Sequence, residues 1–413
     1  MNIQFPKYEN IEKFCLQNFN LAYNCFEDLT TNFEKYQGQF ENSFSNVLKK
    51  PPIYFEWNSY RFPVFIHQDQ KELFSENGKI NFDIFLNIFL FLSGFQEILC
   101  EKKDSHGRFP FNESLQAKYG FTEIPVVNIY FDLLYETALK NNIRIERISY
   151  KKPIIFTHDI DQLRSGWFEN IQFELSHFSC KSFWRIPKNI FIKTFGLKDD
   201  FHKGMEKMLL IDKENNIEAV SFFLVDKSHK NADFDITKNK FKSILAEAKK
   251  SQELGIHPTY EAFDNEYKYE TELNKLQKFT NNKITKSRQH FLRYNIEKTP
   301  FIQEKIGIEE DYTLGFAEQY GFRNGITNPF YLYNFEEQRA FKVKQIPLVF
   351  MDVTLINYTL KNDFKKVLQF IDNINSNFNC NFSILFHNSV FSDGKYEGFE
   401  EMYQQLISIS QKK

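Results

Sequence analysis

The sequence predicts an α/β protein in which a distorted (β/α) barrel of about seven strands follows a small α+β domain. Two observations lead to this prediction. From residue 154 onward, short apolar runs alternate with longer helical segments, which is typical of a series of strands and helices. Before that point the pattern is mixed and more helical. The Lys151-Lys152-Pro153 step separates the two patterns, so we expect an N-terminal domain over residues 1–148 and a barrel over residues 149–413.

The N-terminal region contains four recognisable elements. Residues 53–57, Ile-Tyr-Phe-Glu-Trp, form an extended aromatic piece that favours a strand. Residues 82–99 carry apolar side chains around most of a helical circumference, which predicts a buried helix. A turn over Asp104–Phe109 and a helix over residues 126–142 follow. No role for this region can be predicted from its sequence.

Seven apolar runs define the strands expected in the barrel. They are residues 154–157, 219–224 and 255–257, a weak run near Ile284, and residues 313–316, 347–353 and 382–386. Such a series suits a (β/α) barrel in which one strand is missing or distorted. In barrels of this kind the catalytic groups lie at the carboxyl ends of the strands, so the residues that follow each run are the place to look for a site.

Composition and charge exclude several classes of protein. The formal net charge is −2, and neither sign forms a long block, so nothing indicates a nucleic-acid partner. The most apolar run, Ile84–Leu92, is too short for an integral membrane segment. The N-terminus shows no secretion signal, and five scattered cysteines without a CxxC pair indicate reduced thiols. We therefore expect a cytoplasmic protein, whose oligomeric state the sequence does not reveal.

Polar residues that can bind metal follow four of the predicted strands. The strand ends supply Asp159 and Asp161 in the run Phe156-Thr157-His158-Asp159-Ile160-Asp161, and then His257, His290 and His387. Burying several ionisable groups in one cavity costs free energy that a metal ion or a reaction must offset. The pattern therefore predicts one polar site at the mouth of the barrel.

Several segments resemble the polysaccharide deacetylase family, also called the nodulation-factor deacetylase homology domain or carbohydrate esterase family four. The resemblance is to a branch with a Thr-His-Asp-x-Asp first motif and an uncharacterised N-terminal domain. It is carried by Thr157–Asp161, Gly255–Tyr260, Arg288–Arg293, Thr313–Phe316, Gly321–Gly325, Met351-Asp352 and Phe386–Ser389, and upstream by Asp83–Phe85 and Asp104–Phe109. These segments span nearly the whole chain.

This resemblance implies a metal-dependent hydrolase that removes an acetyl group from an N- or O-acetylated sugar, such as a polysaccharide precursor. Carried over, Asp159 is the base that deprotonates the attacking water, Asp161 and His257 are metal ligands, and His387 protonates the leaving amine. The implied cofactor is a divalent ion, zinc first, with cobalt, nickel, manganese and iron as alternatives. A catalytically decayed carbohydrate-binding barrel and a hydrolase of another C–N amide bond are the alternative functions.

The third metal ligand is open, because the family's second motif carries two histidines where this chain has His257 and then Glu261. His290 could complete the site from the next strand end, Glu261 could supply an oxygen ligand, or the metal could be weakly bound or absent.

Other polar residues near the motifs are candidates for supporting roles. Arg288, Arg293 and Arg323 are candidates for orienting Asp159 or gripping the substrate, with Arg293 and Arg323 assigned to the catalytic set. Two further expectations are that His158 orients the first motif and that Asp352 pairs with one of the arginines.

Overall fold

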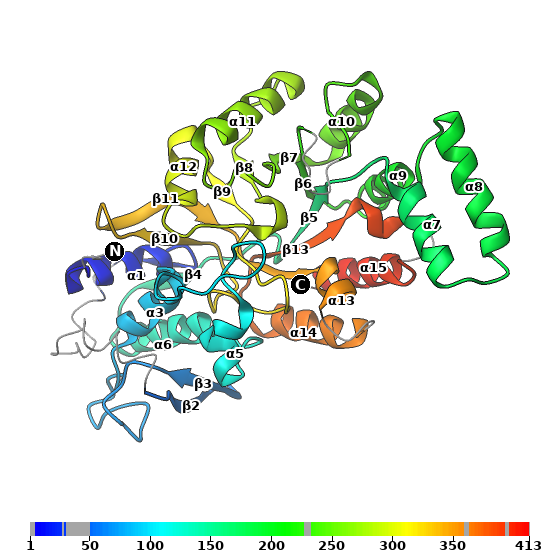
Figure 1. The fold of residues 1–413 in the computed structure, drawn as a ribbon. Helices are drawn as coiled ribbons and strands as arrows, with labels where there is room; N and C mark the ends of the chain where they lie inside the picture. The colour runs from blue at the N-terminus through cyan, green and yellow to red at the C-terminus, as the bar shows by residue number, and fades with distance from the viewer. Residues whose placement is uncertain are drawn as a thin grey trace.

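The centre of the protein is a curled, mostly parallel sheet of nine strands (Figure 1). The computed structural model describes residues 5–26, 29, 50–226, 233–358, 363–392 and 396–412. The strand order is β10-β11-β9-β8-β7-β6-β5-β13-β12, and only the β10–β11 pair is antiparallel. The bounds are β5 Ile154–Ile160, β6 Val220–Phe223, β7 Glu253–Ile256, β8 Lys286–Ser287, β9 Glu310–Asp311, β10 Phe330–Asn334, β11 Arg339–Gln345, β12 Leu348–Met351 and β13 Phe382–His387.

The chain between β11 and β12 brings the two flanks of the sheet together. The Ile346 and Leu348 amides donate to the carbonyls of Asp311 and Leu314 at 2.8 and 3.1 Å, and the Ser383 amide donates to the carbonyl of Pro347 at 2.8 Å. The sheet therefore curls into a barrel-like wall, as the predicted α/β class requires.

Each of the seven predicted runs lies in or beside a strand of this sheet, but the sheet has nine strands where we expected about seven. The unpredicted part is the β10–β11 hairpin. Its residues Tyr331, Lys342 and Lys344 interrupt the apolar pattern, and it pairs with the barrel only through two residues of β9. Apolar runs therefore identified the buried strands and missed the partly exposed ones.

Helices cover the outside of the curled sheet (Figure 1). Asp199, Asn265 and Asp363 cap three of them by accepting a backbone hydrogen bond in the first turn. The bounds are α7 Gly166–Ser176, α8 Ser182–Phe195, α9 Asp200–Glu214, α10 Asn239–Ser251, α11 Glu266–Thr280, α12 Thr299–Ile306, α13 Asp352–Asn357, α14 Phe364–Asn377 and α15 Phe399–Ser410, with 3₁₀ turns η3 His290–Leu292 and η4 Asn388–Phe391. The α7–α8 pair projects away from the body (Figure 1). No helix in the described ranges has the length and apolar character needed to cross a bilayer.

The N-terminal segment combines helices with two small antiparallel sheets, β1–β4 and β2–β3. The predicted strand at residues 53–57 and helix at 126–142 are confirmed as β2 and α6. The predicted helix at 82–99 is broken into α3 and α4 at Gly94, which has a positive φ of 80°. The bounds are α1 Tyr8–Phe19, β1 Tyr23–Cys25, β2 Ile53–Trp57, β3 Tyr60–Val64, α3 Ile84–Leu92, α4 Phe95–Ile98, η2 Phe111–Glu113, α5 Leu115–Tyr119, α6 Val126–Lys140 and β4 Ile145–Arg147.

The N-terminal segment and the barrel share one hydrophobic core. Every residue of α3 is buried, and α3 packs against β10 of the barrel. Polar contacts cross the same junction: Asn128 donates to Thr327 Oγ1 at 2.9 Å, and Arg323 pairs with Glu97 at 2.6 Å. The elements of the N-terminal segment are thus packed directly onto the barrel, and the boundary near residue 148 stays a prediction.

Candidate metal centre

The strand β5 delivers two carboxylates to one cavity because side chains alternate along a strand. Asp159 and Asp161 are two residues apart and line the cavity at the carboxyl end of the sheet. His158 points the other way and is fully buried. Its Nδ1 lies 3.1 Å from the Phe386 carbonyl and its Nε2 lies 3.0 Å from Asp212 Oδ2. The contacts of His158 therefore tie β5 to β13 and α9.

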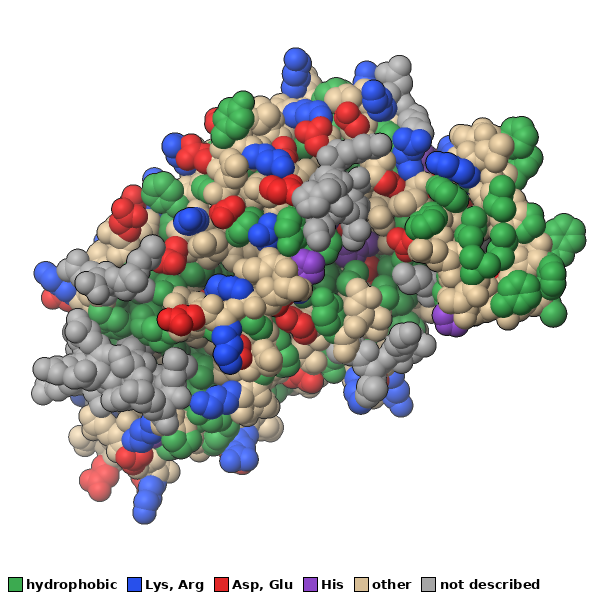
Figure 2. All heavy atoms as spheres, viewed as in Figure 1, with side chains coloured by type: hydrophobic (Ala, Val, Ile, Leu, Met, Phe, Trp, Pro, Cys, Tyr) green, Lys and Arg blue, Asp and Glu red, His purple; other side chains and the backbone are tan. Residues whose placement is uncertain are grey.

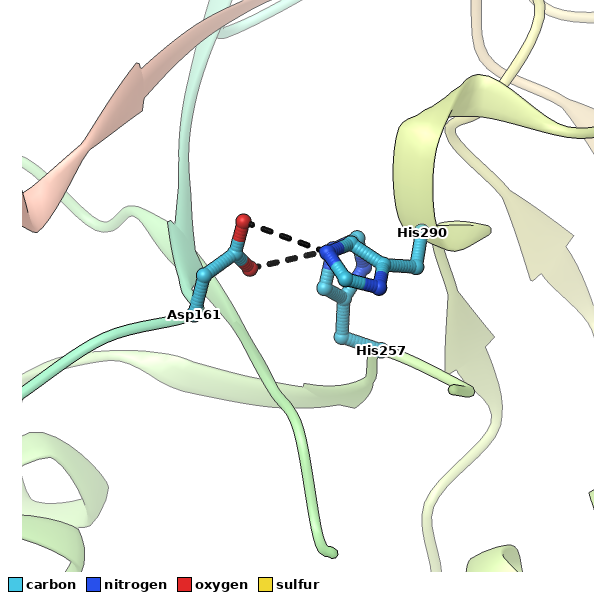
Figure 3. A group of neighbouring side chains, drawn as sticks. All are labelled: Asp161, His257 and His290. Atoms are coloured by element: carbon cyan, nitrogen blue, oxygen red, sulfur yellow. Dashed lines mark ion pairs between the residues drawn. The ribbon is translucent and has the colours of Figure 1, made fainter. Parts of the chain in front are cut away.

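Asp161, His257 and His290 form a compact group of possible metal ligands (Figure 3). One ligand atom from each residue lies within 4.8 Å of the other two. His257 Nε2 is 3.2 Å from Asp161 Oδ1, and His290 Nε2 is 3.5 Å from Asp161 Oδ2. The three residues follow β5, β7 and β8, so adjacent parallel strands bring together positions far apart in the sequence.

The donor set fits a divalent cation. His257 Nδ1 donates to the Arg288 carbonyl at 2.6 Å, which leaves Nε2 facing Asp161 as the ligand atom. His290 is 3% exposed, yet neither of its ring nitrogens forms a hydrogen bond of good geometry with a described residue. A buried imidazole in this state needs a partner. One carboxylate with two imidazoles is a set that zinc and similar ions accept.

Electrostatics within the group also suit metal binding. Burial raises the pKa of Asp161, but the neighbouring His257 and His290 outweigh it and hold that pKa well below its usual range. Burial lowers the pKa of His290 and so favours the neutral imidazole that a metal requires. For His257, burial is outweighed by Asp159 and Asp161, which raise its pKa. Metal binding would therefore compete with protonation of His257 Nε2.

Asp159 lies beside this group and is held by a buried arginine. Its Oδ2 is 3.6 Å from His257 Nε2, and its Oδ1 is 3.2 Å from Arg288 Nη1. Arg288 is fully buried, and its Nε also donates to the Tyr312 carbonyl at 3.0 Å. The Arg288 guanidinium lies 4.8 Å from the ring centre of Phe222. Of the three candidate arginines, Arg288 is thus the one that contacts Asp159.

The space for the Phe222 ring depends on a glycine in the next strand. An ideal Cβ on Gly255 would lie 2.4 Å from that ring. Any larger residue at position 255 would clash with the Phe222 ring, so only glycine allows that ring to pack against the guanidinium of Arg288. Gly255 lies two residues before the candidate metal ligand His257.

His387 reaches the same cavity from the end of β13. Asp352 accepts a hydrogen bond from His387 Nδ1 at 2.7 Å and another from the His387 amide at 2.6 Å. The expected pairing of Asp352 with an arginine is therefore wrong, because this histidine occupies both carboxylate oxygens. His387 Nε2 lies 3.7 Å from Asp161 Oδ2. Burial lowers the pKa of His387, but Asp352 and the site carboxylates outweigh it and raise the pKa to about 10.

These side chains line a cavity of about 290 Å³. Two polar residues of the cavity wall, His106 and Arg108, come from the N-terminal segment. Neither was predicted from the sequence. Arg108 Nη1 donates to the Phe291 carbonyl at 3.1 Å, and Arg108 Nε pairs with Asp104 at 2.6 Å. Phe291 has a strained positive φ of 60° directly after His290. The only sequence signal for this contact was the predicted turn over Asp104–Phe109.

The cavity lining does not include the candidates Arg293, Arg323 and Glu261. Arg293 donates to the His106 carbonyl at 2.8 Å, and its guanidinium lies 3.9 Å from the ring centres of both Tyr260 and Phe263. Arg323 is buried against Glu97, to which it donates two hydrogen bonds. Glu261 pairs with Lys268 at 3.0 Å and is not part of the metal-ligand group. Of the two open choices for the third ligand, the geometry therefore brings His290, and not Glu261, to Asp161.

Comparisons with known proteins give two kinds of match. Residues 1–144 match the model of a family of unknown function, DUF7033. No curated protein matches the sequence. Similar solved structures include a protein assigned as a polysaccharide deacetylase from Mycobacterium smegmatis, with 12% identity, 63% of this chain and 87% of that chain covered, and a TM-score of 0.40.

Two further solved structures are similar at the same level. A family 4 carbohydrate esterase from Streptomyces lividans in complex with acetate has 9% identity, coverage of 62% of this chain and 89% of that chain, and a TM-score of 0.31. A carbohydrate esterase family 4 pseudoenzyme from Bacillus anthracis has 12% identity, coverage of 63% and 62%, and a TM-score of 0.31. At such low TM-scores these likenesses carry no argument about activity, which depends on the geometry of the site itself.

Proposed function

We propose that the protein is a divalent-metal-dependent hydrolase that removes an acetyl group from an N- or O-acetylated sugar. The observation that carries the proposal is the convergence of Asp161, His257 and His290 in one compact group. Asp159 lies 3.6 Å from His257, and His387 lies 3.7 Å from Asp161. Besides the metal ligands, hydrolysis needs one group that takes a proton from water and one that gives a proton to the leaving atom. The Asp159 carboxylate and the His387 imidazole can fill these two roles.

When bound, the metal supplies Lewis acidity, which polarises the acetyl carbonyl and lowers the pKa of a water molecule. The residues of the chain do the rest. Asp159 takes the proton of the attacking water, and Arg288, 3.2 Å away, holds that carboxylate in place. His387 gives a proton from Nε2 to the leaving nitrogen or oxygen, while Asp352 holds its Nδ1. Both groups then need to exchange protons before the next cycle.

Several finer assignments belong to this proposal. Zinc is the first choice of metal, because one carboxylate and two imidazoles form one of its common ligand sets; cobalt, nickel, manganese and iron remain alternatives. We propose a polysaccharide precursor as the acetylated substrate and a cytoplasmic location for the reaction.

The test combines metal analysis with acetate release. The purified chain is stripped with a chelator and reloaded with each candidate metal, and acetate is then measured with a panel of acetylated sugars. We expect one metal per chain and acetate release that depends on it. Asp159→Asn should keep the metal and lose activity by at least about a hundredfold.

A matched pair of variants tests the ligand set. His290→Ala should reduce metal content sharply, because it removes one of three ligands. Glu261→Gln, four residues after His257 but paired with Lys268, should retain full metal content. No stoichiometric metal in the wild-type chain, or equal metal loss in both variants, would contradict the proposed centre. Full metal content without acetate release from any sugar would contradict the reaction alone.

A further inference from the structure

The helical pair α7–α8 exposes an unusual amount of apolar surface (Figure 2). Nine of the sixteen large apolar side chains exposed among the described residues lie between positions 168 and 197. They include Phe178, Phe183, Trp184, Ile190, Phe191 and Phe195, and Trp184 is 84% exposed. Figure 2 shows hydrophobic side chains gathered on the projecting part of the molecule. An exposed patch of this kind usually marks an interaction surface.

The apolar side chains of α8 form one stripe on its outer face. Phe183, Trp184, Pro187, Ile190 and Phe191 recur at the spacing of one helical face. The opposite face is the buried one, where Ser182, Asn189 and Ile192 pack toward α7. The stripe is therefore a second apolar face that is left uncovered, not the incompletely buried edge of a core-facing helix.

Basic residues border this stripe, and acidic ones are absent from it. Between residues 177 and 198 the chain carries five basic residues and no Asp or Glu, although acidic residues outnumber basic ones in the whole chain. The five are Lys181, Arg185, Lys188, Lys193 and Lys198. Helical spacing places Lys188 and Lys193 on opposite edges of the stripe. Long lysine side chains at such edges can reach outward while the aromatic rings between them are buried.

The base of the pair is hydrogen-bonded to the start of α9. Asp199 accepts hydrogen bonds from the amides of Gly166 and Trp167 at 2.9 and 2.8 Å. At the far end, Glu174 of α7 accepts hydrogen bonds from Ser182 and Arg185 of α8 at 2.6 and 2.8 Å. These contacts join the two helices to each other and to α9, which packs against η4 beside the cavity.

We propose that the α7–α8 pair docks onto an anionic lipid bilayer, with the aromatic stripe at the level of the lipid headgroups. Exposed Trp and Phe flanked by lysine form the pattern of a helix that lies in a membrane interface. The stripe projects from a convex pair rather than lining a groove, so it suits a soft planar surface. A two-fold contact with a second copy through the stripe would bring the flanking Lys188 and Lys193 of both copies toward one another.

Docking also places the proposed centre next to the bilayer. Glu169 of α7 lines the cavity and accepts a hydrogen bond from Tyr396, another lining residue, at 3.1 Å. The pair therefore begins at the rim of the cavity. We infer that the acetylated sugar is carried on a lipid of that bilayer. This second step rests on the proposed function, whereas docking itself does not.

Vesicle binding tests the docking step without any substrate. The full chain is mixed with vesicles of phosphatidylcholine alone or of phosphatidylcholine with phosphatidylglycerol, and the bound fraction is measured by sedimentation. We expect binding to the anionic vesicles only, weakened by added salt. A blue shift of tryptophan fluorescence on binding should disappear in Trp184→Phe, which keeps the apolar stripe.

Surface variants locate the docking site. Lys188→Gln should weaken binding about fivefold, since one lysine near an anionic surface is worth about 1 kcal/mol. The double variant Trp184→Ser/Phe191→Ser should weaken it by at least about tenfold. Tyr267→Ser is the matched control, because Tyr267 is 79% exposed but lies on α11, away from the pair. All of these positions are exposed, so folding should be unaffected.

Several results would overturn the docking step. They are absence of binding to both vesicles, equal binding to neutral and anionic vesicles, and equal binding by the double variant and the Tyr267→Ser control. Self-association that the double variant abolishes, without vesicle binding, would instead assign the stripe to a second copy of the chain.

Acetate release distinguishes the second step from the proposed function. With a lipid-anchored acetylated sugar in vesicles, the double variant should release acetate at least about tenfold more slowly than wild type. With the same sugar free in solution, the two proteins should be equal. Vesicle binding without acetate release from any sugar would contradict the proposed function but not the docking step. Faster acetate release from the free sugar than from the anchored one would contradict only the inference that the substrate is carried on a lipid.

Discussion

Replacing Arg288 with methionine should destabilise the protein through the carboxylate that it leaves behind. Arg288 is fully buried, and its guanidinium contacts Asp159 Oδ1 at 3.2 Å, Thr157 Oγ1 at 2.7 Å and the Tyr312 carbonyl at 3.0 Å. Methionine keeps most of the side-chain volume and removes all three hydrogen bonds. Asp159, itself 3% exposed, then remains buried without its cation.

The expected cost follows from this geometry. Removing one partner of a buried ion pair costs about 3–5 kcal/mol, because the remaining charge stays buried without the cation that compensated it. A chain of 413 residues has an unfolding entropy of about 0.9 kcal/mol/K. The melting temperature of Arg288→Met should therefore fall by about 3–6 °C.

Thermal unfolding of four proteins measures this effect in chelator, so that metal binding does not contribute. They are wild type, Arg288→Met, Asp159→Asn and the double variant. Arg288→Met leaves the charge of Asp159 without its partner, and Asp159→Asn removes that charge. The double variant should therefore recover roughly half of the stability that Arg288→Met loses. Arg144→Met is the control: its ion pair with Glu146 spans 3.9 Å between side chains that are 72% and 60% exposed, so little change is expected.

A loss below about 1 kcal/mol in Arg288→Met would refute the reasoning, since that is the scale of an exposed pair. Strict additivity of the two substitutions would refute it too, because the stranded carboxylate would then not be the cause of the loss. A fall in Arg144→Met equal to that in Arg288→Met would show that the effect does not depend on burial.

Two more predictions concern other charged pairs. Asp352→Asn removes the charge that holds His387 Nδ1 at 2.7 Å; acetate release should fall by about 10²–10⁴-fold while metal content stays unchanged, and loss of metal would contradict the assignment of Asp352 to His387 alone. Glu97→Gln leaves Arg323 buried without its carboxylate; the free energy of unfolding, measured by denaturant titration, should fall by about 3–5 kcal/mol, with metal content again unchanged in the folded protein.

The position of the centre could be predicted from sequence because strand geometry is regular. Side chains alternate along β5, so Asp159 and Asp161 had to share one face and His158 the other. The carboxyl ends of neighbouring parallel strands meet at one edge, so His257 and His387 had to lie near that face. These inferences need only the strand assignment and its direction.

The choice among the arginines could not be predicted in this way. Arg288 follows β8 directly, so its side chain enters the barrel beside Asp159. Arg293 lies after the 3₁₀ turn η3, where Phe291 and Leu292 both have positive φ values. Those two left-handed residues turn the chain away from the cavity. No periodic pattern in the sequence reports such a turn, so spacing alone could not tell Arg288 and Arg293 apart.

Two arginines that lie outside the cavity, Arg293 and Arg323, hold the N-terminal segment beside it. Arg293 donates to the carbonyl of His106, and Arg323 pairs with Glu97 of α4. Each is therefore a barrel residue that fixes a part of the N-terminal segment. Arg108, two residues beyond His106, lies in the cavity wall. Contacts over such sequence separations depend on the docking of whole elements, and it is this docking that makes the segment of unknown function part of the candidate site.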